Sequence, residues 1–237
     1  MPFNQHYTYL IIDLACISVP LIASFYRPRP FFKEWRYYFP ANLIVSLLFI
    51  IWDIIFTDAG IWGFNPDYLT GIYIFNLPLE EVLFFISIPY ACVFTWFAIS
   101  YLIKRNPITV FQKYLSLFFI VLLLTFGIVH INKWYTSITF LITAVILLFF
   151  LWKGADLSYV YLSYIFVLPF FFMSNGILTG SIIESPIVWY NHQENMNLRI
   201  GTIPAEDSIY GFLLVLLNIE LYQFFKLKWT NKKKATE

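Results

Sequence analysis

Charged residues are scarce in this sequence. Asp, Glu, Lys and Arg make up only 12% of its 237 residues, whereas 60% are hydrophobic. A soluble domain carries about a quarter charged residues, and it needs that polar surface to cover its core. The net charge of only +1 also gives no electrostatic basis for binding nucleic acid. The composition therefore excludes a soluble domain and a nucleic-acid partner.

Cysteine and glycine are also rare, with two and nine residues respectively. Cys16 and Cys92 lie inside apolar runs with no Cys or His at ligand spacing, so we interpret them as small packing residues. The sequence has no glycine-rich loop of the nucleotide-binding kind. We therefore expect no metal site, no disulfide and no cofactor such as FAD, NAD or ATP.

Long apolar runs are what the sequence has in abundance. A run of about 20 apolar residues can cross a hydrocarbon layer of about 30 Å as a helix. Seven such spans can be drawn, at roughly Tyr7–Phe25, Phe39–Phe56, Pro78–Ile103, Tyr114–Ile131, Trp134–Trp152, Ser158–Met173 and Ile203–Phe225. The sixth span is drawn to end at Met173, because Pro169 sits near that end and the polar triplet Ser174-Asn175-Gly176 follows it. The predicted fold class is an all-α polytopic membrane protein.

The basic residues predict the orientation of these spans. The first, third and fifth connections and the C-terminal tail together hold 13 of the Lys and Arg residues, and the opposite side holds only Lys133 and Arg199. Basic residues concentrate on the cytoplasmic side of a membrane. We therefore expect the N-terminus outside and the C-terminus inside, in a multi-pass protein of a bacterial plasma membrane.

The two long outer connections, residues 57–77 and 174–202, are rich in Trp, Tyr and Ile. Irregular backbone near a bilayer persists only where protein covers it or where it lines a cavity. We expect these connections to form buried or re-entrant structure at the membrane surface.

A short internal repeat relates the two halves. Phe64-Asn65 and Leu77-Pro78-Leu79-Glu80-Glu81 match Tyr190-Asn191 and Ile203-Pro204-Ala205-Glu206-Asp207 at one offset of 126 residues. Asp53-Ile-Ile-Phe-Thr57 matches Asn175-Gly-Ile-Leu-Thr179 with a four-residue difference. We predict a first repeat over residues 1–105, a connector helix over 106–133 and a second repeat over 134–237. A single connector span makes the repeats parallel and brings two acidic helix starts together.

The acidic residues at these helix starts are the candidates for chemistry. They are Glu80, Glu81, Glu206 and Asp207, with Asp53 at the end of the second span. Two acids after a helix-starting proline can simply compensate the helix dipole. At the edge of the hydrocarbon layer, however, carboxyl groups are costly and usually face a protein interior. Two such groups could supply a general acid and a general base.

The roles of two further aspartates stay open. Asp58 follows the second span closely enough to join this acidic cluster. Asp13, inside the first apolar span, could serve either structural pairing or function.

Aromatic residues make up 22% of the chain. Most of them should face lipid or form the interfacial belt. One group differs because it flanks the acids: Trp52, Trp62, Phe64, Phe84, Phe85, Trp189 and Tyr190. Aromatic faces stabilise cations without acting as nucleophiles. Acids in a dry aromatic pocket suit the protonation of an alkene and the steering of the carbocation.

These motifs together resemble the membrane lycopene cyclase domain of carotenoid synthesis. The first half carries Trp52-Asp53, Thr57, Gly60, Trp62, Phe64 and Pro78-Leu79-Glu80-Glu81 followed by Phe84-Phe85. The second half carries Asn175, Thr179, Tyr190 and Pro204-x-Glu206-Asp207-x-x-Tyr210. That domain occurs as two separate subunits or as a fused tandem, and this chain is similar to the fused form.

The resemblance implies a lycopene β-cyclase, an isomerase that closes the linear ends of lycopene to β-ionone rings and gives β-carotene through γ-carotene. It implies catalytic roles for Glu80, Glu81, Glu206, Asp207 and Asp53. It also implies substrate contacts from Trp52, Trp62, Phe64, Phe84, Phe85, Asn175, Thr179, Trp189, Tyr190 and Tyr210. The expected partners are the carotenoid and membrane lipid. Which acid donates the proton, and whether the chain forms a homo-oligomer, both stay open.

Three alternatives remain. An ε-cyclase or a cyclase of C50 carotenoids would differ only in base placement or substrate length. A prenyltransferase would need aspartate-rich motifs and basic residues for a diphosphate, and the outer side has almost no Lys or Arg. A proton-coupled transporter would use intramembrane acids, but usually near the bilayer midplane rather than at its edge.

Overall fold

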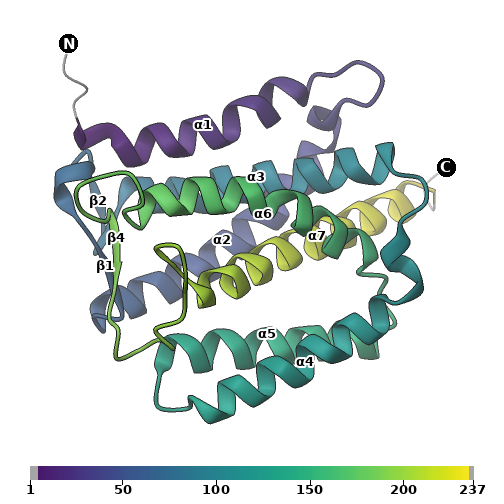
Figure 1. The fold of residues 1–237 in the computed structure, drawn as a ribbon. Helices are drawn as coiled ribbons and strands as arrows, with labels where there is room; N and C mark the ends of the chain where they lie inside the picture. The colour runs from purple at the N-terminus through teal and green to yellow at the C-terminus, as the bar shows by residue number, and fades with distance from the viewer. Residues whose placement is uncertain (1–4, 235–237) are drawn as a thin grey trace.

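The computed structural model describes residues 5–234, with side chains up to Asn231. Within that range it is a bundle of seven helices that are long and apolar enough to cross a membrane (Figure 1). They are α1 (Thr8–Ala23), α2 (Trp35–Asp58), α3 (Leu79–Leu102), α4 (Gln112–Val129), α5 (Trp134–Trp152), α6 (Ser158–Leu178) and α7 (Ala205–Lys234). The all-α polytopic fold predicted from the sequence is confirmed. The side chains of Lys232, Lys233 and Lys234, counted above among the basic residues, lie outside the described part.

The predicted end of the sixth span is wrong, because α6 continues through Pro169 and the polar triplet to Leu178. The polar side chains are satisfied inside the protein, so the helix has no reason to stop. The Ser174 hydroxyl donates to the Phe170 carbonyl at 3.0 Å, and Asn175 finds a carboxylate on α7. A polar residue in a membrane helix is tolerated where the bundle supplies a partner.

The two long outer connections contain short strands and partly buried side chains. The strands are β1 (Trp62–Phe64), β2 (Tyr73–Ile74), β3 (Leu77–Pro78), β4 (Val188–Tyr190), β5 (Arg199–Ile200) and β6 (Ile203–Pro204). Single 3₁₀ turns occur at Gln5–Tyr7, Phe31–Glu34, Pro66–Tyr68 and Pro107–Val110. Strands β2 and β3 form a hairpin before α3, and β5 and β6 form the matching hairpin before α7.

Strands β1 and β4 join the two halves across a twofold pseudo-symmetry axis. They pair antiparallel, with Gly63 opposite Trp189 at the centre. The backbone hydrogen bonds that flank this pair are equivalent in the two halves. The Asn65 backbone N–H donates to the Ile187 carbonyl, and the Asn191 backbone N–H donates to the Ile61 carbonyl, both at 2.8 Å. The two donors are 126 residues apart in the sequence, and so are the two acceptors. A side chain at Gly63 would collide with the Trp189 ring, so this contact requires glycine.

The helices of the two halves interlock rather than form separate bundles. Helix α1 packs along α3, and its counterpart α5 packs along α7. Helix α2 packs mainly on α7 of the other half, and α6 packs on α3. Helix α4 lies outside this arrangement and packs along α5, as Figure 1 shows at the bottom of the view. The centre of the molecule is therefore formed by α3 and α7, each covered by helices from both halves.

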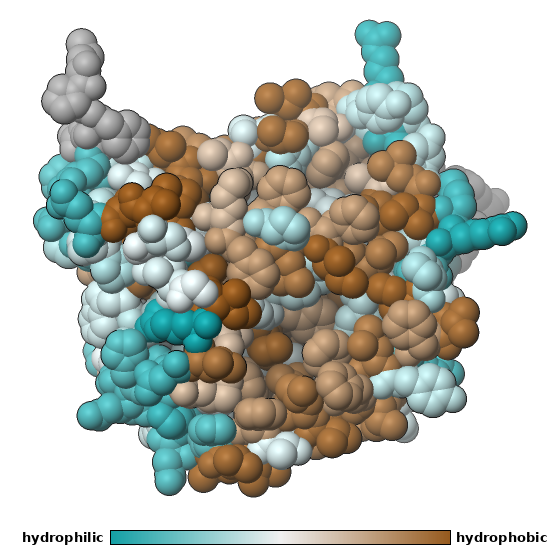
Figure 2. Space-filling model, in the orientation of Figure 1, coloured by the Kyte–Doolittle hydropathy of each residue, from teal (hydrophilic) through white to brown (hydrophobic). Residues whose placement is uncertain are grey.

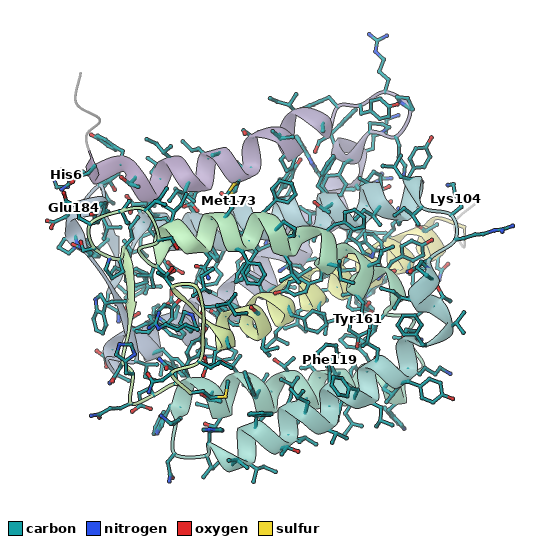
Figure 3. All side chains as sticks on the ribbon, in the orientation of Figure 1. His6, Lys104, Phe119, Tyr161, Met173 and Glu184 are labelled. Carbon is teal, nitrogen blue, oxygen red and sulfur yellow. The ribbon has the colours of Figure 1, made fainter. Side chains whose placement is uncertain are left out.

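The surface matches a membrane-spanning bundle. Figure 2 shows hydrophobic residues over the middle of the visible face and more hydrophilic residues at the end that carries the strands. Figure 3 places His6 and Glu184 at this strand end and Lys104 at the other end. The acidic starts of α3 and α7 lie at the strand end, directly beneath the hairpins that precede them.

Candidate active site

Two carboxyl groups of the first half lie side by side. Asp53 near the end of α2 lies beside Glu81 in the first turn of α3, close enough for the two carboxyl groups to interact directly. The Trp62 indole N–H donates to Oδ1 of Asp53, and the Thr57 hydroxyl donates to the same oxygen at 3.3 Å. The Tyr9 hydroxyl donates to Oε2 of Glu81 at 2.5 Å. A hydrogen bond between two carboxyl groups requires a proton on one of them, since ionised carboxylates only accept.

The second half holds a carboxyl group with different partners. Asp207 accepts hydrogen bonds from the Tyr135 hydroxyl at 2.5 Å, from the Asn175 amide at 2.7 Å and from the Tyr190 hydroxyl at 2.8 Å. All three partners are donors, which satisfies an ionised carboxylate and favours that form. Burial and the adjacent Asp207 raise the pKa of the Tyr190 phenol well above its usual value, so Tyr190 remains a donor.

The neighbouring acids, Glu80 and Glu206, hold the hairpins in place. Oε1 of Glu80 accepts from the Thr70 backbone N–H at 2.7 Å, and Oε1 of Glu206 accepts from the Met196 N–H at 2.7 Å. The two bonds are repeat equivalents, 126 residues apart. Glu206 also accepts from the Thr136 hydroxyl at 2.6 Å. Both residues are fully buried and neither lines the cavity, so within each acidic pair only the second residue faces it.

A cavity of about 500 Å³ connects the two carboxyl clusters. Asp53, Glu81 and Asp207 line its end nearest the strands, and the rest of its wall is mainly apolar. Its aromatic wall near the acids comes from Trp62, Phe64, Phe84, Tyr190 and Tyr210, all expected from the sequence. A cavity of this size falls within the range of small-molecule sites.

Other residues expected to contact substrate lie elsewhere. Trp52 and Phe85 pack with Phe49 in a core cluster beside the cavity. Thr179 is buried and exchanges a hydrogen bond of 2.7 Å with the Thr202 hydroxyl. Trp189 is exposed on the outer surface over Gly63. These four support the walls or the connections and do not line the cavity.

The two aspartates whose roles were left undecided, Asp58 and Asp13, lie in different environments. Asp58 is exposed at the end of α2 and does not join the cluster. Asp13 is buried in α1, close enough to Glu80 for electrostatic interaction, and its carboxyl oxygens have no hydrogen-bond partner among the described residues.

The carboxyl groups of the cavity also lack a basic partner. Within the described residues, the one ion pair joins Lys226 to Glu34 at 2.8 Å, near the opposite membrane surface. The described His, Cys, Asp and Glu residues form no group of three or more that could hold a metal ion. Among the described residues, no cationic side chain therefore forms an ion pair with these acids.

Sequence reasoning missed Tyr9 and Tyr135. Each is the phenol that donates to the second acid of its half, and each lies 72 residues before that acid. The signal was present, because Tyr9 and Tyr135 are separated by the same 126 residues as the acidic motifs. Tyr164 and Ser174 of α6 also line the cavity, but no repeated motif marks them.

A family profile for lycopene cyclase matches this chain twice, over residues 6–99 and 132–225. The two matches are displaced by the same 126 residues as the hydrogen bonds described above. The chain belongs to the lycopene cyclase family. No curated protein and no solved structure matches it. Membership of this family indicates that this membrane protein is a carotenoid-cyclising enzyme. Both matched segments contribute carboxyl groups to the cavity described above.

Proposed function

We propose that the chain is a lycopene β-cyclase, an isomerase that cyclises the linear ends of lycopene without net redox change. The observation that carries the proposal is the arrangement of two different carboxyl environments in one apolar cavity. Asp53 and Glu81 lie side by side and can share a proton, whereas Asp207 is buried and accepts hydrogen bonds from three donors. Two carboxyl groups in different environments can take the roles of acid and base.

The reaction needs one proton donor and one proton acceptor. The Asp53–Glu81 pair gives its proton to C2 of the terminal double bond, which leaves a tertiary cation at C1. The C5=C6 double bond attacks C1, closes the ring and moves the cation to C5. Asp207 then removes the proton at C6, and a C5=C6 double bond forms in the β-ring. One proton is added and one removed, so the reaction consumes no oxidant, reductant or cofactor.

The walls of the cavity suit the cationic intermediates. The ring centroids of Trp62 and Tyr210 lie 6.0 Å apart, with an angle of 75° between the ring planes. Phe84 lies about one turn after Glu81 in α3. Aromatic faces attract a cation but do not form a stable bond with it. The phenols of Tyr9, Tyr135 and Tyr190 all point their hydroxyls at carboxyl groups, so none is left free to capture the cation.

The test is pigment analysis by chromatography in a host that accumulates lycopene. The wild type should give β-carotene, and Glu81→Gln, Asp53→Asn and Asp207→Asn should each leave lycopene while still inserting in the membrane. General acid–base catalysis contributes about 10²- to 10⁴-fold, which sets the size of the loss. An ε-ring or C50 product from the wild type would redirect the proposal to another carotenoid cyclase. Unchanged lycopene with the correctly inserted wild type would refute it.

A further inference from the structure

The cavity is much longer than the site of ring closure. Along α3 its lining runs from Glu81 to Thr95, a distance of about 21 Å at 1.5 Å per residue. Ala15, Cys16, Val19 and Pro20 of α1 form one wall, and residues 164–178 of α6 form the other. A ring-forming end group needs only the part beside the acids, so the remainder is a groove with room for part of the remaining linear chain.

The rim of this groove faces the bilayer. Val19 of α1 is 71% exposed, and Phe170 and Met173 of α6 are 69% and 64% exposed. All three also line the cavity. Figure 3 shows Met173 on the side of α6 towards α1. Lipid-exposed side chains that also line the interior mark a lateral opening of the groove between α1 and α6.

The seam between α1 and α6 is weakly held. Helix α1 packs mainly on α3 and has few contacts with α6. The Cys16 thiol of α1 lies close to the Ser174 hydroxyl of α6. Pro20 and Pro169 lie in the facing helices, and each removes a helical hydrogen bond. The two walls can therefore separate at a lower cost than the helix pairs of the core.

The repeat-equivalent position in the other half is filled. With the helix offsets established above, Pro20, Ala91, Thr95, Gly211 and Ser174 of the groove correspond to Ile146, Leu217, Leu221, Phe85 and Trp52. These five larger residues all belong to one apolar cluster. Small side chains have thus been placed where the groove is open, and large ones where its counterpart is closed.

We propose that the carotenoid enters sideways from the bilayer between α1 and α6, and that the part of its chain next to the reacting end lies in this groove during cyclisation. The inference rests on the proposed function for the identity of the polyene. One end is then processed at each visit, because the groove holds the chain in a single direction with one end at the acids. The second end requires release into the lipid and rebinding in reverse.

A reversible lock across the seam tests the proposal. Ser174→Cys places a second thiol against Cys16, and oxidation of membranes with copper phenanthroline should join α1 to α6. Lycopene added to the oxidised membranes should be cyclised at least tenfold more slowly than in reduced membranes, and dithiothreitol should restore the rate. The double variant Cys16→Ala with Ser174→Cys should not respond to oxidant. Mass spectrometry of the joined peptides verifies the bond.

Equal rates with and without the verified cross-link would overturn the proposal. Ala91→Leu and Thr95→Leu provide a second test that needs no disulfide, because they copy the closed half deep in the groove, away from the acids. They should lower the rate at least tenfold, while Ile86→Phe on the exposed face of α3 should not. Unchanged rates in both groove variants would also refute it.

Quenching of tryptophan fluorescence by lycopene in nanodiscs separates this proposal from the proposed reaction. If the reduced enzyme forms no ring, the proposed function fails. Quenching that is slowed by the cross-link would still support entry of lycopene between α1 and α6, and quenching at the same rate would refute it.

Discussion

The two halves of this molecule build the same scaffold around different chemistry. In each half a tyrosine of the first helix donates to the second acid of the motif, and the first acid holds a hairpin. The partner of that second acid differs, since Glu81 meets the carboxyl group of Asp53 and Asp207 meets the amide of Asn175. A carboxyl partner shares a proton, whereas an amide N–H stabilises a negative charge. One side-chain difference can therefore separate an acid from a base on equivalent backbones.

The largest effect should come from removing that difference. Asn175→Asp would place a second carboxyl group beside Asp207, so that the pair shares a proton and Asp207 stops acting as a base. We expect cyclisation to fall by about 10²-fold or more, in line with the loss of a general base. Chromatography of pigments from a lycopene-accumulating host measures it. Asn197→Asp adds the same charge on the exposed outer connection and should leave the rate unchanged. Similar rates for both variants would contradict the assignment of Asp207.

A second prediction copies the closed half into the open one. Ser174→Trp introduces the residue found at the equivalent position 52, and it should fill the cavity at the seam between α1 and α6. A side chain that occupies this space competes with the carotenoid, and a clash of about 1–3 kcal/mol corresponds to roughly 5- to 150-fold in binding of the carotenoid. The same assay should show the loss as a higher apparent KM. Ile165→Trp, on the lipid-exposed face of the same helix, serves as the control and should behave like the wild type.

The contact between the halves gives a third prediction. Gly63→Ala would bring its Cβ to 2.3 Å from the Trp189 ring, so the β1–β4 pair must shift. We expect a loss of about 1–3 kcal/mol in the free energy of unfolding, measured in detergent. Because Trp189 is exposed, Gly63→Ala with Trp189→Ala should recover most of that loss. If the double variant is no more stable than the single one, the clash is not the cause.

The smallest effect should come from the first acid of each motif. Glu80→Gln and Glu206→Gln retain an oxygen that accepts the Thr70 and Met196 N–H groups, so the hydrogen bonds to the hairpins can remain. We expect a stability loss of about 1 kcal/mol in each case and cyclisation rates within about twofold of the wild type. Thermal unfolding and pigment analysis give the two values. A loss as large as that of Glu81→Gln would show that Glu80 takes part in the reaction.

The sequence predicts the bundle well, because apolar length decides whether a helix crosses a bilayer. All seven spans were identified, and the error at α6 came from treating Ser174-Asn175 as a break when these residues find partners inside the bundle. The acids were found because the repeat marks their positions. Trp62 and Phe84 were found because they flank the acids in sequence, and Tyr210 was implied by the resemblance to lycopene cyclases.

What the sequence did not reveal depends on which way side chains point. Glu80 and Glu81 are adjacent in the motif, yet helix geometry turns one towards a hairpin and the other towards the cavity. Trp52 and Phe85 flank the acids in sequence but face the core cluster. The groove is lined by residues of four helices, with small ones such as Ala91, Ser174 and Gly211 at its open positions, and small residues carry no local motif.

The pairing of β1 with β4 has the geometry of an interface between identical subunits, because each half offers the same edge and receives the same bonds in return. In a true homodimer, any substitution appears at both copies of a site. Such an assembly could not carry Asp53 opposite Asn175, or Ser174 opposite Trp52. Carrying both halves on one polypeptide, with α4 as the tether between them, is what frees each copy to vary alone, so asymmetry of the active site is a consequence of how the halves are encoded.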